Sequence, residues 1–198
     1  SLLAEEACLD AGVSLAYYQF PQKVVETKEG WLVDVVGQGV QYQLRCKQII
    51  DCSGGAEVVG MLGMERMIEE TRQPGTHVVT FKGFDMKVVK ENAALIKKKY
   101  DEAIKNGSLQ KGDTWSGHIM GVIASTRGNT NHIFGADSTN AATQTQTNLA
   151  GRKCVLRLLK FFKTIPGGEN ASIDKMMNET ASRETYRIKG ETIITVHD

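Results

Sequence analysis

The sequence predicts a mixed fold, α/β passing into α+β, from two observations. First, residues 45–60 read as a short buried strand with Ile49 and Ile50, a turn at Gly54 and Gly55, and then a helix. Second, strand-like and helical periodicities alternate along the rest of the chain. In an open α/β sheet, the end of such a strand is where a nucleotide binds to the free N–H groups of the following helix. The alternative is an ordinary strand-to-helix turn.

The composition argues against several classes of protein and partner. The chain has 198 residues, of which 24 are basic and 23 acidic, and its longest run of like charge covers residues 97–99. This balance argues against nucleic acid and anionic membranes as partners. The four cysteines form no C-x-x-C pair, and the four histidines lack the spacings of a metal site. We expect a cytoplasmic protein, because these scattered cysteines among apolar neighbours fit a reducing compartment. There is also neither an apolar run of about 18 residues nor a signal segment.

Residues 1–60 are expected to form one α/β domain. An amphipathic helix over residues 1–11 precedes a strand at residues 13–18. Three short strands separated by glycine turns follow, which is typical of an antiparallel meander. These strands cover residues 23–27, 31–36 and 40–45. The meander leads into the buried strand that ends at Gly54.

Residues 61–198 are expected to form a second domain, in which a mixed sheet packs against helices. Met61, Met64 and Met67 recur every three residues, as in a core stripe. A long helix before Pro166 carries the stripe Val155, Leu158, Leu159 and Phe162. The other predicted elements are strands at 76–84, 117–124, 132–135 and 186–196, a helix at 88–104, and a short helix with Ile173, Met176 and Met177.

Several side chains are candidates for chemistry. Ser53 is not expected to be a hydrolase nucleophile, because the G-x-S-x-G motif needs glycine at position 51 and the chain has Asp51. His132, like His118, either faces a pocket as a proton donor or is a half-exposed strand histidine. Arg183 either holds a carboxylate or forms a surface ion pair. No G-x-G-x-x-G opens a helix, so the chain alone is not expected to bind a dinucleotide pyrophosphate.

Three segments resemble motifs of FAD-dependent oxidoreductases with a flavin domain of the two-dinucleotide-binding type. Residues 49–57, I-I-D-C-S-G-G-A-E, are similar to the motif v-I-D-A-T-G-D-a-D. Residues 137–140, followed by Gly151 and Arg152, are similar to D-a-T-n … e-G-R. Residues 182–191 are similar to G-x-R-E-T-R-R-i-x-G-e, which is the most specific of the three. The departures from these motifs are Gly55, Ala56, Ser182 and residues 144–148.

The resemblance implies FAD as cofactor and hydride transfer between a small-molecule substrate and the flavin. In the family, the turn that matches Ser53 and Gly54 passes its backbone along the FAD, and the strand that matches Val24 lies near the adenine. Arg183 is implied to face the substrate or flavin, with His132 as a second residue that orients or polarises the substrate.

The resemblance also bears on the extent of the chain. The G-x-G-x-x-G and the end of the flavin site would lie on missing N- and C-terminal segments, so we expect an internal fragment that does not itself retain FAD. The alternative is a free-standing, non-enzymatic domain that binds a ligand or another protein.

Overall fold

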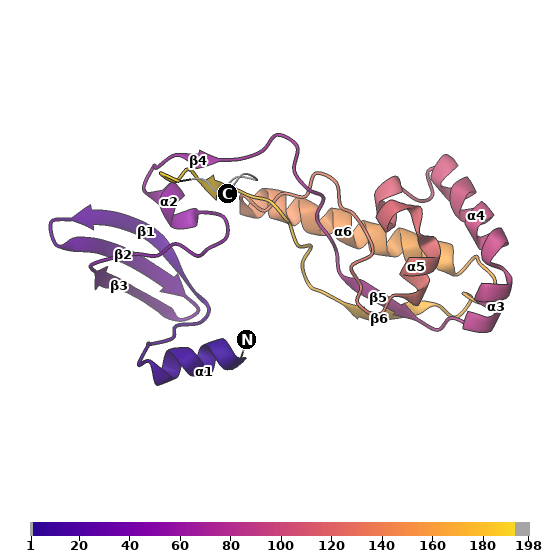
Figure 1. Cartoon of the computed structure of the whole chain (residues 1–198), viewed down its shortest axis with the longest axis horizontal. Helices are drawn as coiled ribbons and strands as arrows, with labels where there is room; N and C mark the ends of the chain where they lie inside the picture. Colours follow the sequence, from indigo (N-terminus) through magenta and orange to yellow (C-terminus); the bar gives the residue numbers. More distant parts are fainter. Residues whose placement is uncertain (1, 193–198) are drawn as a thin grey trace. The chain divides into compact units, whose positions relative to one another are not determined.

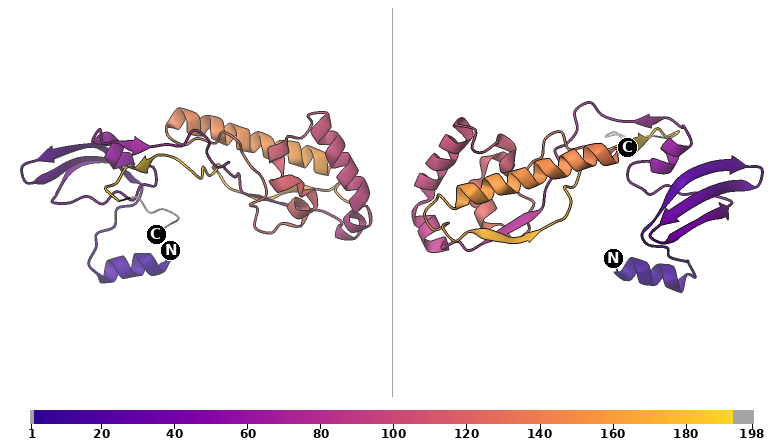
Figure 2. Two further views of the ribbon diagram at one scale, coloured as in Figure 1. Left: turned by 45° about the horizontal axis from the view of Figure 1, so that its top comes forward. Right: turned by 180° about the vertical axis from the view of Figure 1, so that it is seen from behind.

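The computed structural model describes residues 2–192 (Figure 1), and two further views show the same elements from other sides (Figure 2). The chain divides into two compact units. The first runs to Met67 and resumes at Tyr186, and the second comprises Ile68–Thr185. The helices are accompanied by small antiparallel sheets, which confirms the predicted fold class. The sequence predicted a single boundary after Gly60. It did not predict that the chain returns to the first unit at Tyr186.

The first unit is built on the predicted meander. Helix α1 (Leu2–Asp10) precedes strands β1 (Gln19–Thr27), β2 (Gly30–Gly37) and β3 (Val40–Cys46), which pair antiparallel in this order. Helix α2 (Glu57–Met61) comes next, and β4 (Arg66–Met67) pairs with β7 (Arg187–Ile188). Because side chains alternate along a strand, one face of the sheet presents an apolar row to α2. The small core of this unit comprises Val24, Val33 and Val35, against which Val58 and Leu62 pack.

Three predictions for the first unit are wrong. Residues 13–18 form no strand, because Tyr18 has a φ of 60°, which breaks an extended conformation. The predicted buried strand with Ile49 and Ile50 is absent: residues 47–52 are irregular and Ile50 is 87% exposed, because no described strand pairs with them. Met61 and Met64 are exposed rather than part of a core stripe, because the chain leaves α2 through a turn at Gly63.

The second unit has a larger core. Strands β5 (Val79–Lys82) and β6 (Ser172–Met176) pair antiparallel, and side chains of helices α3 (Met86–Glu91), α4 (Ala93–Lys105), α5 (Ile119–Ala124) and α6 (Ala141–Phe162) share one core with them. The longest helix, α6, buries Val155, Leu158 and Phe162 as predicted, with Leu159 partly buried beside them. Phe81 of β5 contacts Phe162 edge to face, with 4.9 Å between the ring centroids.

The sheet predicted for the second unit is mostly absent. Residues 117–124 contain helix α5, whose buried Ile119, Val122 and Ile123 have helical spacing, i, i+3 and i+4. Residues 132–135 make only a bridge between Ile133 and Gly75.

The elements on either side of these segments also differ from prediction. The helix predicted at residues 88–104 is interrupted at Asn92, whose side chain donates a hydrogen bond to the carbonyl of Val88. The short helix predicted around Ile173 is strand β6, because this segment pairs with β5. Residues 193–196 of the predicted last strand lie outside the described residues.

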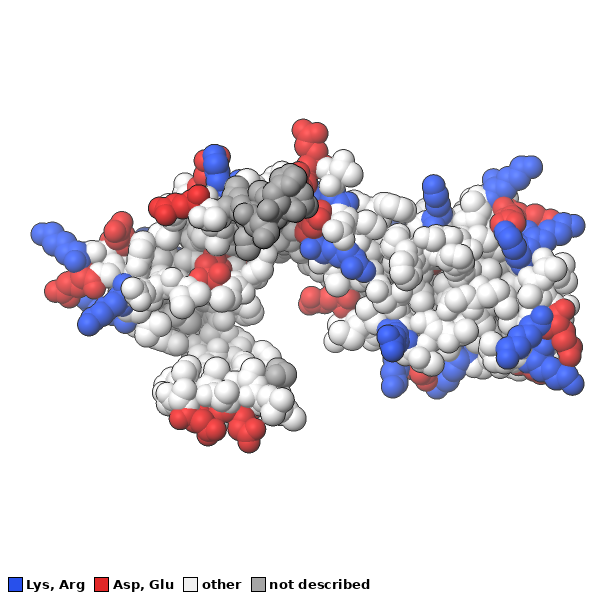
Figure 3. Space-filling model, in the orientation of Figure 1, with Lys and Arg blue, Asp and Glu red and all other residues white. Residues whose placement is uncertain are grey.

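Charged side chains cover both units. The acidic residues of α1 project together from one side of that helix, while lysines and arginines mixed with acidic residues surround the end of the second unit that carries α3 and α4 (Figure 3). Within residues 2–192, no helix is long and apolar enough to cross a membrane. The same residues contain no group of three His, Cys, Asp or Glu side chains that could hold a metal ion.

Candidate functional site

The turn after residue 50 is organised by the carboxylate of Asp51. One carboxylate oxygen accepts a hydrogen bond from the backbone N–H of Ser53, at 3.0 Å. The other accepts from Val58 and Val59, at 3.0 and 3.2 Å. The Ser53 hydroxyl accepts from the N–H of Glu57 at 2.9 Å. Burial acts to raise the pKa of Asp51, but the hydrogen bonds from Ser53, Val59 and Val58 outweigh it and lower the pKa below its usual value.

These hydrogen bonds occupy the N–H groups at the start of α2. A helix N-terminus binds a phosphate through N–H groups that have no other partner. Here Glu57, Val58 and Val59 already donate to side chains of the turn, and α2 is only five residues long. The expectation of free N–H groups behind the turn is therefore wrong, and the turn is not a pyrophosphate site.

The turn nevertheless presents an accessible backbone. Ser53 and Gly54 are exposed. Gly54 has a φ of 80°, and a side chain added there would meet no atom of the chain within 4 Å. Val24 is 6% exposed and packs in the core beneath α2, so it contributes support to this region rather than an open surface. The backbone of the turn is therefore accessible at Ser53 and Gly54, with Val24 buried beneath α2.

Arg183 lies in the second unit, on the loop between β6 and β7. One of its terminal nitrogens, Nη2, donates to the hydroxyl of Thr76 and to the side-chain oxygen of Asn129, both at 3.3 Å. Its neighbour Glu184 accepts from the backbone and side-chain nitrogens of Gln73, at 2.9 and 3.2 Å. Arg183 itself is exposed. The loop is thus fixed by Glu184, while Arg183 beside it remains exposed.

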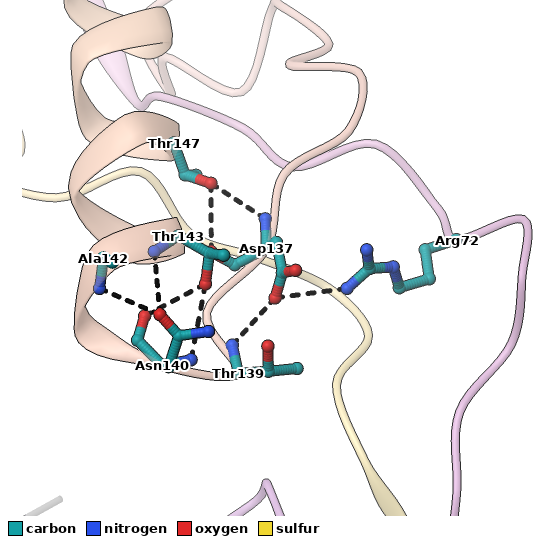
Figure 4. Close-up of polar contacts among 7 residues, drawn as sticks. All are labelled: Arg72, Asp137, Thr139, Asn140, Ala142, Thr143 and Thr147. Carbon is teal, nitrogen blue, oxygen red and sulfur yellow. Dashed lines mark hydrogen bonds and ion pairs between the residues drawn. The ribbon is translucent and has the colours of Figure 1, made fainter.

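The segment before α6 is held by a second polar cluster (Figure 4). Asp137 accepts from the N–H of Thr139 at 2.8 Å and forms an ion pair with Arg72 at 3.2 Å. Burial acts to raise the pKa of Asp137, but these contacts lower it. Thr147 binds both the N–H and the carbonyl of Asp137, and Asn140 caps the first turn of α6. The motif at residues 137–140 therefore fixes the start of α6.

A buried polar network packs against α6 at Gly151. His77 is fully buried, and its Nδ1 lies 2.8 Å from the hydroxyl of Thr180. Asn131 binds both the N–H and the carbonyl of His77, at 2.9 and 2.8 Å. Burial, and then the charge of Arg152, lower the pKa of His77. A side chain at Gly151 would collide with Thr180 and His77, so the glycine permits this close approach.

His132 lies at a pocket on the same unit. The pocket has a volume of about 450 Å³ and is also lined by Lys111, Ser116 and Phe134. The His132 ring lies beside the rings of Trp115 and Phe134, with centroid distances of 6.3 and 6.1 Å. Arg183 does not line this pocket.

The structure thus groups the predicted site residues by unit. Ser53, Gly54 and Val24 belong to the first unit, and Arg183 and His132 to the second. Arg183 contacts Asn129, three residues before His132 in the chain, but no contact joins the two side chains among the residues described. Sequence reasoning missed the partnership of His77 with Asn131 and Thr180, which lie 54 and 103 positions away and leave no local pattern.

Comparison with known proteins gives one result. A family model described as FAD dependent oxidoreductase matches residues 1–198, the whole chain. No curated protein and no solved structure gives a significant match.

Proposed function

Because this chain belongs to the family of FAD dependent oxidoreductases, we propose that it transfers a hydride between a small-molecule substrate and the flavin. The observation that carries the proposal is the exposed backbone at Ser53 and Gly54, in a chain that the family model matches over its whole length. FAD, when bound, supplies the hydride-accepting or hydride-donating ring. The protein then has to orient the substrate and hold its polar groups.

The chain's own residues suit these tasks. Asp51 fixes the turn so that the backbone at Gly54 is exposed with no side chain in the way. On the other unit, Arg183 carries a permanent positive charge on a loop held by Glu184. We propose that Arg183 binds an anionic or carbonyl oxygen of the substrate and that His132 orients or polarises it. Val24 supports the turn from below through the core shared with α2.

A matched pair of glycine variants tests the flavin contact. Gly54 and Gly63 belong to the same unit, both have positive φ, and neither has an atom within 4 Å of an added side chain. Gly54→Leu and Gly63→Leu therefore introduce comparable backbone strain, but only Gly54→Leu blocks an approach along the turn. In the protein as its gene encodes it, we expect Gly54→Leu to weaken FAD binding by about tenfold or more. A tenfold change corresponds to about 1.4 kcal/mol of binding free energy. Equal FAD content in both variants, measured from the flavin absorbance, contradicts the proposal.

A second comparison tests the substrate-facing residues. Arg183→Met and His132→Leu are expected to retain FAD but to slow anaerobic reduction of the flavin, which is followed by the loss of its visible absorbance. Arg127→Met is the control, because Arg127 belongs to the same unit and has no described ion pair. If Arg183→Met and Arg127→Met reduce the flavin at the same rate, Arg183 has no role at the substrate.

A further inference from the structure

We propose that the pocket beside His132 binds a small, planar molecule with one carboxylate. We call it the Lys111 pocket, after the cation on its wall. This binding goes beyond the proposed function and does not depend on it, because Arg183 does not line this pocket. Its volume of about 450 Å³ is within the range of small-molecule sites.

The loop that forms one wall is rigidly held. Asp113, 1% exposed, accepts two hydrogen bonds from Arg157 of α6, at 2.8 and 2.6 Å. The next residue, Thr114, shares a hydrogen bond of 2.7 Å with the hydroxyl of Tyr100. The carbonyl of Gly112 accepts from the N–H of His132 at 2.7 Å. These anchors fix the residues on either side of the pocket before any ligand arrives.

Gly112 allows the two walls to meet. A side chain at this position would collide with the carbonyl of His132 and come within 2.9 Å of the Phe134 ring. The loop therefore lies directly against residues 132–134 and holds the Phe134 ring beside the pocket. Phe134 is 65% exposed, which is a large apolar surface to leave uncovered on a pocket wall.

Three polar groups on the pocket lack partners. Within the part of the chain that the structure describes, no hydrogen bond or ion pair is made by three groups: the Lys111 ammonium, the Ser116 hydroxyl and the His132 ring. Tyr100 and Thr114, by contrast, satisfy each other. Ser116 also has a left-handed backbone, φ 52° and ψ 28°, which is strained for a residue with a side chain. Such strain within a firmly anchored loop is characteristic of ligand sites.

These groups define the chemistry of the ligand. An ammonium and a hydroxyl on one pocket both donate hydrogen bonds to a carboxylate. Ile104 and Phe134 offer apolar surface for a flat ring. Asp101 lines the same pocket, with Lys97 as its ion-pair partner at 3.3 Å, and its charge repels ligands with several negative charges. A planar monocarboxylate therefore fits better than phosphate.

The test is a titration of the full chain with benzoate in the absence of FAD. Trp115 lies beside His132, so its fluorescence reports binding once the other tryptophan is removed by Trp31→Phe. We expect saturable binding of benzoate that is tighter than that of cyclohexanecarboxylate or inorganic phosphate. Lys111→Met should weaken it about tenfold, the effect of losing one charge-assisted hydrogen bond. Lys98→Met, an exposed α4 lysine outside the pocket, should leave it unchanged.

The outcomes separate this proposal from the flavin proposal. Absence of benzoate binding, or equal weakening by Lys111→Met and Lys98→Met, overturns the pocket assignment, even if the Gly54 variants confirm the flavin contact. Phosphate or cyclohexanecarboxylate binding as tightly as benzoate overturns the ligand class. Benzoate binding that depends on Lys111 supports the pocket even if the flavin contact at Gly54 proves wrong.

Discussion

At the scale of single residues, His77 is a titratable side chain that the fold removes from water. It is fully buried, and its Nε2 has no hydrogen-bond partner among the residues described. The imidazole is therefore best accommodated uncharged, and burial together with Arg152 lowers its pKa. In the unfolded chain the same ring titrates near its ordinary value of 6.5. Below that pH the unfolded chain binds a proton that the folded chain does not.

This difference predicts a dependence of stability on pH. Because the unfolded state binds more protons, the free energy of unfolding is highest above pH 6.5 and falls as the pH drops toward the lowered pKa of the folded state. We expect His77→Gln to lose this component of the slope below about pH 6.5. His118→Gln, at an exposed histidine, should keep it. Urea unfolding at several pH values measures the slopes, and equal slopes for wild type and His77→Gln contradict the prediction.

At the scale of secondary-structure elements, the position of α6 depends on the glycine within it. Gly151 faces Thr180 and His77 so closely that an added methyl group would overlap both. Glycine normally weakens a helix by about 1 kcal/mol relative to alanine. Its presence here is explained by packing, because the buried network around His77 needs the space.

A pair of alanine variants tests this explanation. Gly151→Ala should lower the free energy of unfolding of the second unit by about 1–3 kcal/mol, the usual cost of overpacking a core. Gly121→Ala in α5 is the control, since Gly121 is exposed and an added methyl group would lie 3.7 Å from the nearest atom, Cβ of His118. It should raise stability by up to about 1 kcal/mol. A stabilising Gly151→Ala, measured by thermal or urea unfolding, would show that the helix can move away.

The elements also show which parts of the fold the sequence predicts. The meander and α6 were predictable, because their glycine turns and apolar stripe are local patterns. Helix α5 was misread as a strand because a short apolar run suits both structures, and only the burial of Ile119, Val122 and Ile123 distinguishes them. The turn at Ser53 was located correctly. Its capping by Asp51 was not predicted, because the sequence does not show that this carboxylate reaches the N–H groups of Val58 and Val59. The Lys111 pocket was missed for the same reason, since its walls come from separate segments.

At the scale of the whole molecule, the two units differ in how much apolar surface they bury. Among the residues described, the core of the first unit comprises three buried side chains, Val24, Val33 and Val35, with a few partly buried neighbours. The core of the second unit extends over α3 to α6 and both strands β5 and β6. Burial of apolar area is the main source of folding free energy, at about 25 cal/mol per Å². We therefore expect the second unit to be the more stable of the two.

Hydrogen exchange followed by mass spectrometry tests this order and the division itself. Backbone amides open locally with free energies that follow the packing around them, so amides in α4 and α6 should exchange more slowly than those in β1, β2 and β3. Gly151→Ala provides the sharper test, because it destabilises only the second unit if the units unfold separately. Its exchange should then accelerate in α6 and α4, while the meander keeps its wild-type rate. Faster exchange in the meander as well would mean that the two units unfold as one cooperative body, because a collision confined to Gly151, Thr180 and His77 can reach β1–β3 only through shared unfolding.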